Sequence, residues 1–494
     1  MLLLKRRCQV KDEDTVPAKA NIPPYAILII IMLLSIGEFL SGTSAIFVTL
    51  MAATLSCIAV TYNLLGGLRT FTGLLFSAFS LRTIVISQVA KVLFFETADK
   101  NLEAPMYTIK VYLLFYFCVM VGVFVFGRIR LNLPKPMEST THAQSKVIYA
   151  LSLTIGLVAQ TAAAITSSKG GDNQYGDSRS LGIVLSAALL FALVIAVDVK
   201  IRSSNGAHSF GVGVFVPWAL IMFFSFLDTS RGGIISPSIV YVVTCFVRGY
   251  KFKIRHFAAA LVGILLFVLY ISPFEIYSRG ILYGLPFKDR TYEAVYLLRT
   301  APDRATFAIV SQLDADTGEA RTEYIRHRGA TLINRLAMIS ADSTLISACS
   351  TGFHYGWTAL KVDLLHNIPR RLYKNKPEED SAGYIGRVSG MNPDSVQNGE
   401  SAISPISDSF GGFGWYGVIV LGFITFPLMV VIFESVFDFR LIWGTVALGM
   451  LLPYLGEGSM GAYIATILRT PTYVVVLSYV IGGVVRLVPS RMEQ

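Results

Sequence analysis

The chain has 494 residues, of which 53% are hydrophobic and only 15% are charged, and its formal net charge at pH 7 is +10. Soluble globular domains carry about 25% charged residues, so this composition excludes an ordinary soluble protein. It predicts an all-α polytopic membrane protein. Many of the cations lie at the ends of apolar segments, where membrane topology places them, and this position argues against a nucleic-acid partner.

Apolar runs of about 20 residues, or roughly 17 at the short end, can cross a bilayer as helices. On this criterion the sequence predicts about twelve transmembrane helices. Three of them are weak, because 233–247 and 441–455 are short and contain a proline, and because 71–95 carries Arg82 and Lys91. The predicted ranges are 25–41, 44–62, 71–95, 111–127, 147–166, 181–198, 211–227, 233–247, 257–272, 412–433, 441–455 and 470–486.

The distribution of Lys and Arg predicts the orientation of these helices. The N-terminal tail, 1–24, has no small-residue cleavage site and contains five cations, so we expect a cytoplasmic tail rather than a signal peptide. The short connections on the same side as the tail together carry more Lys and Arg than those on the opposite side. This bias is weakest at the Arg69 connection and clear after the fourth and eighth spans. The domain organisation is then spans 1–9 in 25–272, a large extracytoplasmic loop in 273–409, spans 10–12 in 410–488, and a cytoplasmic C-terminal tail in 489–494.

The large hydrophilic loop is the feature around which the sequence is organised. A loop of this length is usually functional rather than a simple connection. Apolar periodicity predicts helices over 289–300 and 321–348, and the turn residues that follow Gly352 predict an irregular second part. Within the second helix, three arginines at intervals of seven form one stripe, which is either solvated or a basic face turned towards anionic headgroups or a pyrophosphate. They are Arg321, Arg328 and Arg335.

Several familiar chemistries have little support in the sequence. There is no GxxxxGK[ST] phosphate-binding loop and no HExxH metal motif. The five cysteines form no CxxC pair, so we expect neither a disulfide nor a cysteine metal site. The acidic pair Asp314 and Asp316 is better explained as solvated turn residues than as metal ligands, and we expect no metal and no cofactor. The run Gly411-Gly412-Phe413-Gly414 is better explained by close helix packing or a tight turn.

Three cations have positions that need a physical explanation. Arg231 follows the predicted seventh span at the edge of the hydrocarbon, where a guanidinium is costly unless it is paired or reaches water. It either forms an ion pair with Asp228 or grips a phosphate, whose oxygens the planar fork binds bidentately. Arg82 and Lys91 lie nine positions apart and so on opposite sides of a regular helix, at about 100° per residue. Both therefore cannot line one path: either Arg82 faces a cavity, or the span is shifted so that Lys91 reaches the interface.

Four short segments and the layout of spans and loop resemble the O-antigen polymerase (oligosaccharide repeat-unit polymerase) family of bacterial inner-membrane proteins. The segments are Ser230-Arg231-Gly232, the helical segment around Arg335, Ile368-Pro369-Arg370 with Lys376-Pro377, and the stretch from Asn398-Gly399-Glu400 to Phe410-Gly411-Gly412-Phe413-Gly414. The resemblance implies a glycosyltransferase that joins undecaprenyl-pyrophosphate-linked oligosaccharide units, with the lipid pyrophosphate as leaving group. It also implies a place in the bilayer beside a flippase and a chain-length regulator.

This reaction needs cations for the departing pyrophosphate and a base for the attacking hydroxyl. The expected substrate-binding cations are Arg231, Arg279, Arg335, Arg370 and Arg371. The expected catalytic groups are Glu400, His354 and Asp408, with His366 as a further imidazole in the loop. An O-antigen ligase, a flippase-like transporter and a sensor or scaffold remain alternatives. The dissimilar halves and the ionisable residues gathered in one loop favour the enzyme over a transporter.

Overall fold

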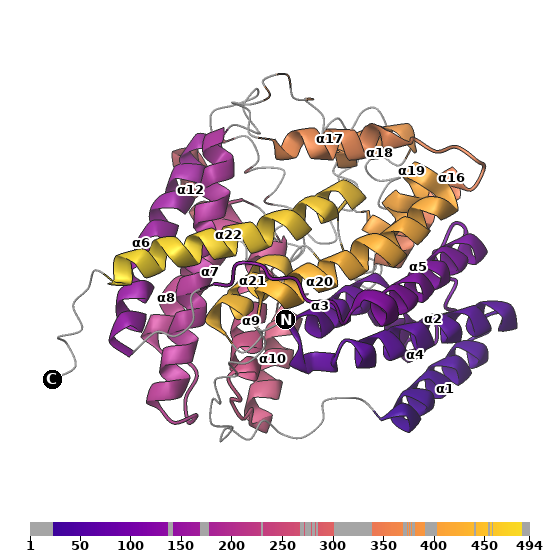
Figure 1. Ribbon diagram of the computed structural model, residues 1–494, viewed down its shortest axis with the longest axis horizontal. Helices are drawn as coiled ribbons and strands as arrows, with labels where there is room; N and C mark the ends of the chain where they lie inside the picture. The colour runs from indigo at the N-terminus through magenta and orange to yellow at the C-terminus, as the bar shows by residue number, and fades with distance from the viewer. Residues whose placement is uncertain are drawn as a thin grey trace, which may run out of the picture.

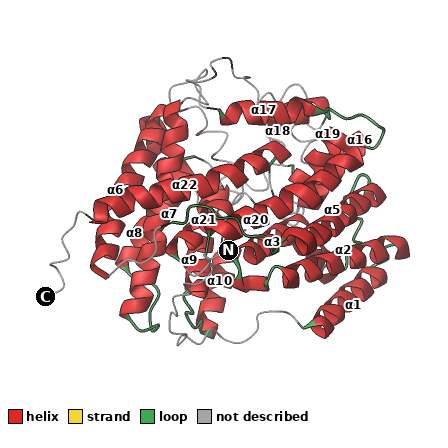
Figure 2. Ribbon diagram, in the orientation of Figure 1, coloured by secondary structure: helices red, strands yellow, loops and turns green. Residues whose placement is uncertain are grey.

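The computed structural model describes residues 23–136, 142–167, 177–228, 231–266, 285–300, 338–368, 381–390, 403–438, 441–452, 455–456 and 458–486, with single residues at 271, 278, 282, 373, 375 and 377. All regular elements among these residues are helices, and no strand occurs in them (Figures 1 and 2). The all-α prediction is therefore confirmed for the described chain.

The described helices form three groups along the chain. The N-terminal part contains α1 (Pro24–Leu40), α2 (Ala45–Leu64), η1 (Gly67–Arg69), α3 (Phe71–Ser80), the π turn η2 (Leu81–Val85), α4 (Ile86–Leu93) and α5 (Pro105–Phe126). The middle contains α6 (His142–Ser167), α7 (Asp177–Ser203), α8 (Val212–Leu227), α9 (Arg231–Val247), α10 (Ile254–Leu266), α12 (Phe287–Thr300), α16 (Met338–Cys349), α17 (Trp357–Asn367) and α18 (Ser381–Val388). The C-terminal part contains α19 (Pro405–Val420), the π turn η6 (Leu421–Thr425), α20 (Phe426–Val436), α21 (Ile442–Leu451) and α22 (Met460–Arg486).

Length and composition make six of the described helices long and apolar enough to cross a membrane. They are Ala45–Leu64, Phe71–Leu93, Pro105–Phe126, Gln144–Ile165, Pro405–Val436 and Met460–Gly483. Five shorter apolar helices accompany them: Tyr25–Leu40, Val212–Leu227, Gly233–Val247, Ile254–Gly263 and Ile442–Leu451. The described chain thus fits an all-α membrane protein, and each of the twelve predicted ranges overlaps a helix, although the six long helices are fewer than the twelve predicted crossings.

The structure corrects several predicted boundaries. Helix α22 begins at Met460 rather than at residue 470 and contains Pro471 within it. The helix predicted over 289–300 is confirmed by α12, and α16 is the described end of the helix predicted over 321–348. The prediction of an irregular loop after Gly352 was wrong for two segments, because α17 and α18 are helices. Arg321, Arg328 and Arg335 lie outside the described residues.

The helices of the hydrophilic loop pack on the ends of the long apolar helices. Helix α12 contacts α6 and α8, α16 contacts α5 and α19, and α17 contacts α22. The α12 contacts are apolar: Ala294 and Leu297 share a small cluster with Ala164 near the end of α6 and Leu227 at the end of α8. In Figure 1 these loop helices lie along the upper edge of the molecule. The loop is therefore a packed layer in the parts that the structure describes.

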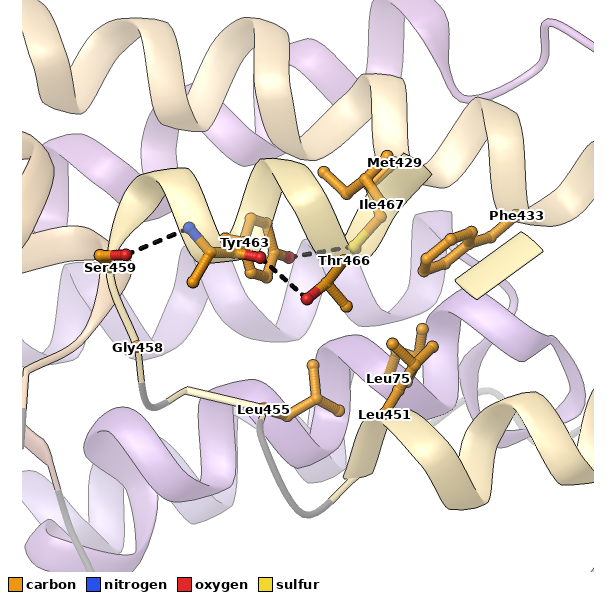
Figure 3. A pocket seen from close by; sticks show the side chains of 11 residues that line it. Leu75, Met429, Phe433, Leu451, Leu455, Gly458, Ser459, Tyr463, Thr466 and Ile467 are labelled. Carbon is orange, nitrogen blue, oxygen red and sulfur yellow. Dashed lines mark hydrogen bonds between the residues drawn. The ribbon is translucent and has the colours of Figure 1, made fainter. Parts of the chain in front are cut away.

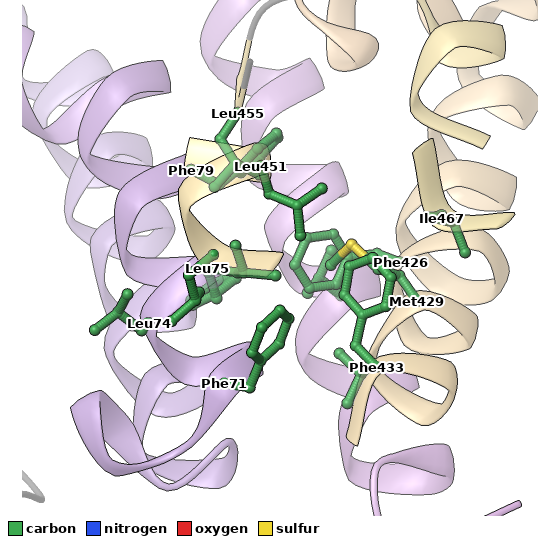
Figure 4. Close-up of a cluster of buried hydrophobic side chains, with 14 of the residues drawn as sticks. Phe71, Leu74, Leu75, Phe79, Phe426, Met429, Phe433, Leu451, Leu455 and Ile467 are labelled. Atoms are coloured by element: carbon green, nitrogen blue, oxygen red, sulfur yellow. The ribbon is translucent and has the colours of Figure 1, made fainter. Parts of the chain in front are cut away.

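The main core joins the N-terminal and C-terminal helices. Figure 4 shows side chains of α3 meeting those of α20 across the interface, with Phe71 edge-on to Phe433 at a centroid distance of 5.5 Å. Near the same end, Glu434 on α20 accepts hydrogen bonds from the Thr72 backbone N–H at 3.1 Å and from its hydroxyl at 2.7 Å. A carboxylate at a helix N-terminus satisfies backbone donors that have no partner within the helix. This contact fixes α20 against the start of α3.

Candidate functional site

Asp342 joins three elements at the loop-covered end of the bundle. It lies on α16, is fully buried, and accepts four hydrogen bonds. The donors are the Tyr112 hydroxyl at 2.5 Å, the Ser404 hydroxyl at 2.5 Å, the Ser407 hydroxyl at 2.6 Å and the Ser404 backbone N–H at 2.9 Å. Tyr112 belongs to α5, and Ser404 is the N-cap of α19. The carboxylate therefore attaches the loop helix to two long apolar helices.

The sequence analysis missed Asp342, although the signal was present. It follows Ile339 by three residues and precedes Ile346 by four, so it lies on the apolar face of α16. Burial raises the pKa of its carboxyl above the usual value, and the hydrogen bonds from Ser404, Ser407 and Tyr112 oppose that shift. An aspartate at such a position is a polar anchor that requires several donors.

Asp408, one of the predicted bases, lies in the first turn of α19 and is buried. Its Oδ1 accepts the Tyr355 hydroxyl at 2.5 Å, and its Oδ2 accepts the backbone N–H of Met460 at 2.5 Å. Met460 is the first residue of α22, so the carboxylate also interacts favourably with the positive end of that helix dipole. Burial, and after it the Asp408 charge, holds the pKa of Tyr355 well above its usual value, so Tyr355 remains a hydrogen-bond donor. These contacts make Asp408 a positioning group for Tyr355.

Helix α19 is broken close to Asp408. Gly414 has φ 62° and ψ −146°, a conformation that glycine adopts far more easily than other residues. The carbonyls of Gly411 and Gly412 accept the backbone N–H groups of Tyr355 and Gly356, at 3.2 Å and 3.0 Å. A Cβ on Gly411 would lie 2.7 Å from the Tyr355 ring. The interpretation of this glycine run as close packing and a tight turn is confirmed.

His354, another predicted base, lies over this break. Its ring is exposed and meets Phe410 edge-on, at a centroid distance of 5.8 Å. A Cβ added to Gly414 would be 3.1 Å from His354 Nε2, so a larger residue there would move the ring by a few tenths of an ångström. Because Tyr355 follows it directly and is bonded to Asp408, the backbone that carries His354 is fixed. An exposed imidazole on a rigid backbone is suited to proton transfer.

A third carboxylate, Asp363 on α17, reaches the same end of α22. The Ser459 hydroxyl donates to Asp363 Oδ2 and accepts the backbone N–H of Ala462 at 3.1 Å. Gly461 allows the close approach, because a Cβ there would lie 2.5 Å from Asp363 Oδ2. Asp363 and Asp408 thus place two carboxylates beside the N-terminus of α22.

An apolar cavity of about 250 Å³ begins beside Ser459 and extends between α3, α20, α21 and α22 (Figure 3). The Tyr463 hydroxyl crosses it to Met429 Sδ at 3.0 Å. The other lining residues are Leu75, Phe433, Leu451, Leu455, Gly458, Ala462, Thr466 and Ile467. The lining suits a hydrocarbon chain, and its Ser459 end lies next to the acidic groups.

The two cations predicted within the third span have different partners. Arg82 lies in the π turn η2 and donates from Nη1 to the Leu455 carbonyl at 3.2 Å. Lys91 is buried, and its ammonium donates to the carbonyls of Ala98 and Lys100, both at 2.7 Å. The expectation that they do not line one path assumed a regular helix, which the π turn η2 interrupts, so it stays a prediction. Lys91 is only 2% exposed, so backbone carbonyls rather than bulk water satisfy its ammonium.

The structure brings together only some of the predicted site residues. His354 and Asp408 share one cluster, and Arg231 is the first residue of α9, directly after the turn that contains Asp228. Asp228 lies 3.7 Å from the Arg290 guanidinium of α12, an ion pair that the sequence did not indicate. His366 Nε2 donates a hydrogen bond to the Pro377 carbonyl at 3.0 Å. The predicted residues Arg279, Arg335, Arg370, Arg371 and Glu400 lie outside the described residues.

A comparison of the chain with protein-family models, with curated proteins and with solved structures found no match.

Proposed function

We propose that this chain polymerises undecaprenyl-pyrophosphate-linked oligosaccharide units into a surface polysaccharide at the periplasmic face of a bacterial inner membrane. In this proposal all twelve apolar segments cross or enter the bilayer, the termini are cytoplasmic, and 273–409 is periplasmic. The apolar helices support a membrane location. The loop helices contact helix ends that the charge distribution assigns to the periplasmic side.

One observation carries the enzymatic part of the proposal. The exposed imidazole of His354 lies over the break in α19, and Tyr355 ties its backbone to the buried carboxylate of Asp408. Non-helical backbone at membrane depth is tolerated where it is buried in protein or lines a cavity. A rigid, exposed base at such a break can meet a lipid-linked substrate that arrives from the bilayer.

In the proposed reaction, an acceptor hydroxyl of one repeat unit attacks the anomeric carbon of another unit. His354 takes the hydroxyl proton as the new C–O bond forms. The bond to undecaprenyl pyrophosphate breaks, and its electron pair leaves with the pyrophosphate, so the anomeric configuration inverts. The reaction is proposed to need no metal, because Arg231 and the loop arginines stabilise the departing charge. Glu400 is the alternative base.

Deleting the gene and separating the surface polysaccharide on a gel tests this function. A polymerase mutant leaves single-repeat glycans on the acceptor, whereas a ligase or flippase mutant leaves none. A normal ladder in the deletion strain would overturn the proposal.

The same strain tests His354. Complementation with His354→Ala and His354→Gln should leave single repeats, while His208→Ala, which changes an exposed histidine in the α7–α8 connection, should restore the ladder. Immunoblotting must show equal protein levels. A full ladder from His354→Ala would transfer the role of base to another group.

A further inference from the structure

Arg82 is a cation at the centre of a membrane-length helix. It is the middle residue of the apolar stretch Phe71–Leu93 and lies in the π turn η2. Its side chain is half-buried. A cation at such a depth is costly in hydrocarbon, so it ordinarily faces the interior of the bundle or a cavity. Single π turns within α-helices are also frequent at functional sites.

The Arg82 side chain lies against the connection between α21 and α22. Its Nη1 donates to the Leu455 carbonyl at 3.2 Å. The next residue, Gly456, has a φ of 81°, and a Cβ there would lie 3.5 Å from Arg82 Cδ. Figure 4 shows Leu455 and Leu451 together with Phe79, which precedes Arg82 by three positions. Because Leu455 and Leu451 line the apolar cavity described above, the Arg82 guanidinium lies on the backbone of the cavity wall.

The lining of this cavity asks little of a polar ligand. Its three hydroxyls all donate within the protein: Ser459 to Asp363, Tyr463 to Met429 Sδ at 3.0 Å, and Thr466 to the Ala462 carbonyl at 2.8 Å (Figure 3). The rest of the lining is apolar and suits a hydrocarbon ligand. Since a cavity of about 150 Å³ holds benzene, one of about 250 Å³ holds on the order of ten carbon atoms, or two isoprene units.

The charged groups beside the cavity orient a ligand that has both an apolar chain and an anionic group. At the Ser459 end lies the Asp363 carboxylate, which repels an anion. At the Leu455 end lies the Arg82 guanidinium, whose planar fork suits phosphate oxygens. An anionic headgroup therefore fits at the Arg82 end of the cavity.

We propose that this cavity and Arg82 together bind the lipid carrier of the substrate. The two isoprene units nearest the pyrophosphate occupy the cavity, and Arg82 binds a phosphate oxygen. This inference rests on the proposed function and deepens it, because it assigns the polyprenyl chain to one cavity and adds Arg82 to the substrate-binding residues. A guanidinium has five N–H donors, so Arg82 can hold the Leu455 carbonyl and a phosphate oxygen at the same time.

Binding to the purified full-length protein in detergent tests the site without turnover. Native mass spectrometry counts the bound molecules, and the probes are farnesyl pyrophosphate, farnesol and inorganic pyrophosphate. Farnesyl pyrophosphate should bind at least about tenfold more tightly than either of the others, because farnesol lacks the charge-assisted hydrogen bonds and inorganic pyrophosphate lacks the apolar chain. Equal binding of farnesyl pyrophosphate and inorganic pyrophosphate would overturn the proposal.

Two variants separate the headgroup from the chain. Arg82→Gln should weaken the binding of farnesyl pyrophosphate by at least about tenfold and leave farnesol unaffected, since only the phosphate contact is lost. Ala462→Leu adds bulk to the cavity lining and should weaken the binding of both isoprenoids. The matched controls are Lys110→Gln, at an exposed cation of α5, and Ala259→Leu, at an exposed alanine of α10. Neither control should change binding.

A purely structural role of Arg82, in which it only fixes Leu455, predicts a different pattern. Arg82→Gln would then weaken the binding of farnesol as much as that of farnesyl pyrophosphate, and that result would overturn the proposal. Unchanged binding of farnesyl pyrophosphate by Arg82→Gln, or of both isoprenoids by Ala462→Leu, would overturn it as well. Arg82→Lys keeps the charge, loses the fork and should bind farnesyl pyrophosphate with intermediate affinity.

The probes also control for misfolding. Farnesol binding by Arg82→Gln shows that its cavity is intact, and inorganic pyrophosphate binding by Ala462→Leu shows that its cation site is intact.

The two proposals fail separately. Arg82-dependent binding of farnesyl pyrophosphate together with a normal polysaccharide ladder in the deletion strain would retain the site and reject the polymerase. A lost ladder without Arg82-dependent binding would retain the polymerase and reject this site.

Discussion

At the scale of single residues, the buried carboxylates Asp342 and Asp408 hold the loop to the apolar helices. Both accept short hydrogen bonds from tyrosine hydroxyls of other elements, Tyr112 and Tyr355. Removing the acceptor of a buried donor costs the desolvation of that donor, about 1–3 kcal/mol for each group. Replacing either carboxylate should therefore mainly lower the stability of the folded protein.

Asp342→Ala should lower the free energy of unfolding by more than about 3 kcal/mol, because the substitution removes the acceptor that three buried hydroxyls and one N–H share. Thermal unfolding of the detergent-purified protein, followed by loss of the monodisperse fraction, measures the effect. Ser340→Ala on the same helix removes only an exposed hydrogen bond to the Asn101 carbonyl and is the control. A melting temperature equal to that of the control would contradict this role.

Asp342 also predicts a pH dependence with a definite sign. Because burial raises its pKa above 3.8, the folded protein binds the proton more tightly than the unfolded chain does. The contribution of Asp342 to the free energy of unfolding is fully present below pH 3.8, the pKa of the carboxyl in the unfolded chain. It is lost as the pH rises through the higher pKa that the carboxyl has in the folded protein. The melting temperature of the wild type should fall relative to that of Asp342→Asn as the pH is raised from about 4 to 7. If the difference in melting temperature between the wild type and Asp342→Asn stayed constant or changed in the opposite direction, the hydrogen bonds would outweigh burial in setting the pKa of Asp342.

At the scale of elements, the sequence predicts apolar helices much better than it predicts their interruptions. Hydropathy locates α2 and α5 because a bilayer-length helix requires a long apolar run. It does not locate the π turns η2 and η6, which depend on packing, or α17, whose stability comes from contacts with α22. The glycine run before residue 415 was interpreted correctly as a packing feature. Its actual partner, Tyr355, lies about 55 residues away in sequence and could not be inferred from local pattern.

Gly414→Ala tests the break in α19. Its φ of 62° and ψ of −146° are strained for any other residue, at about 1–3 kcal/mol, and the new methyl group would meet His354 Nε2 at 3.1 Å. We expect a lower melting temperature together with loss of polymer. Gly263→Ala in α10 is the matched control, because nothing lies within 4 Å of its Cβ position. Wild-type polymer and stability in Gly414→Ala would mean that the break has no role in positioning His354.

At the scale of the whole molecule, the charged groups separate to the two ends of the bundle. The buried pair of Asp198 with Arg248 joins α7 to α9 at one end, while Asp342, Asp408 and Asp363 lie at the other, under the loop helices. Lys and Arg are concentrated at the Asp198 end, which the positive-inside rule assigns to the cytoplasm. The arrangement therefore predicts which exposed residues meet the periplasm.

Single cysteines introduced into a variant without native cysteines test this topology. Lys361→Cys places a thiol on the exposed face of α17, and Lys251→Cys places one in the exposed connection between α9 and α10. In intact cells with a permeable outer membrane, a membrane-impermeant maleimide should label the first and not the second, because the inner membrane separates the reagent from the α9–α10 connection. Both should react once the inner membrane is opened with detergent. If only the Lys251→Cys protein were labelled in intact cells, the loop would lie in the cytoplasm. Lipid-linked units on the periplasmic side could then not reach His354.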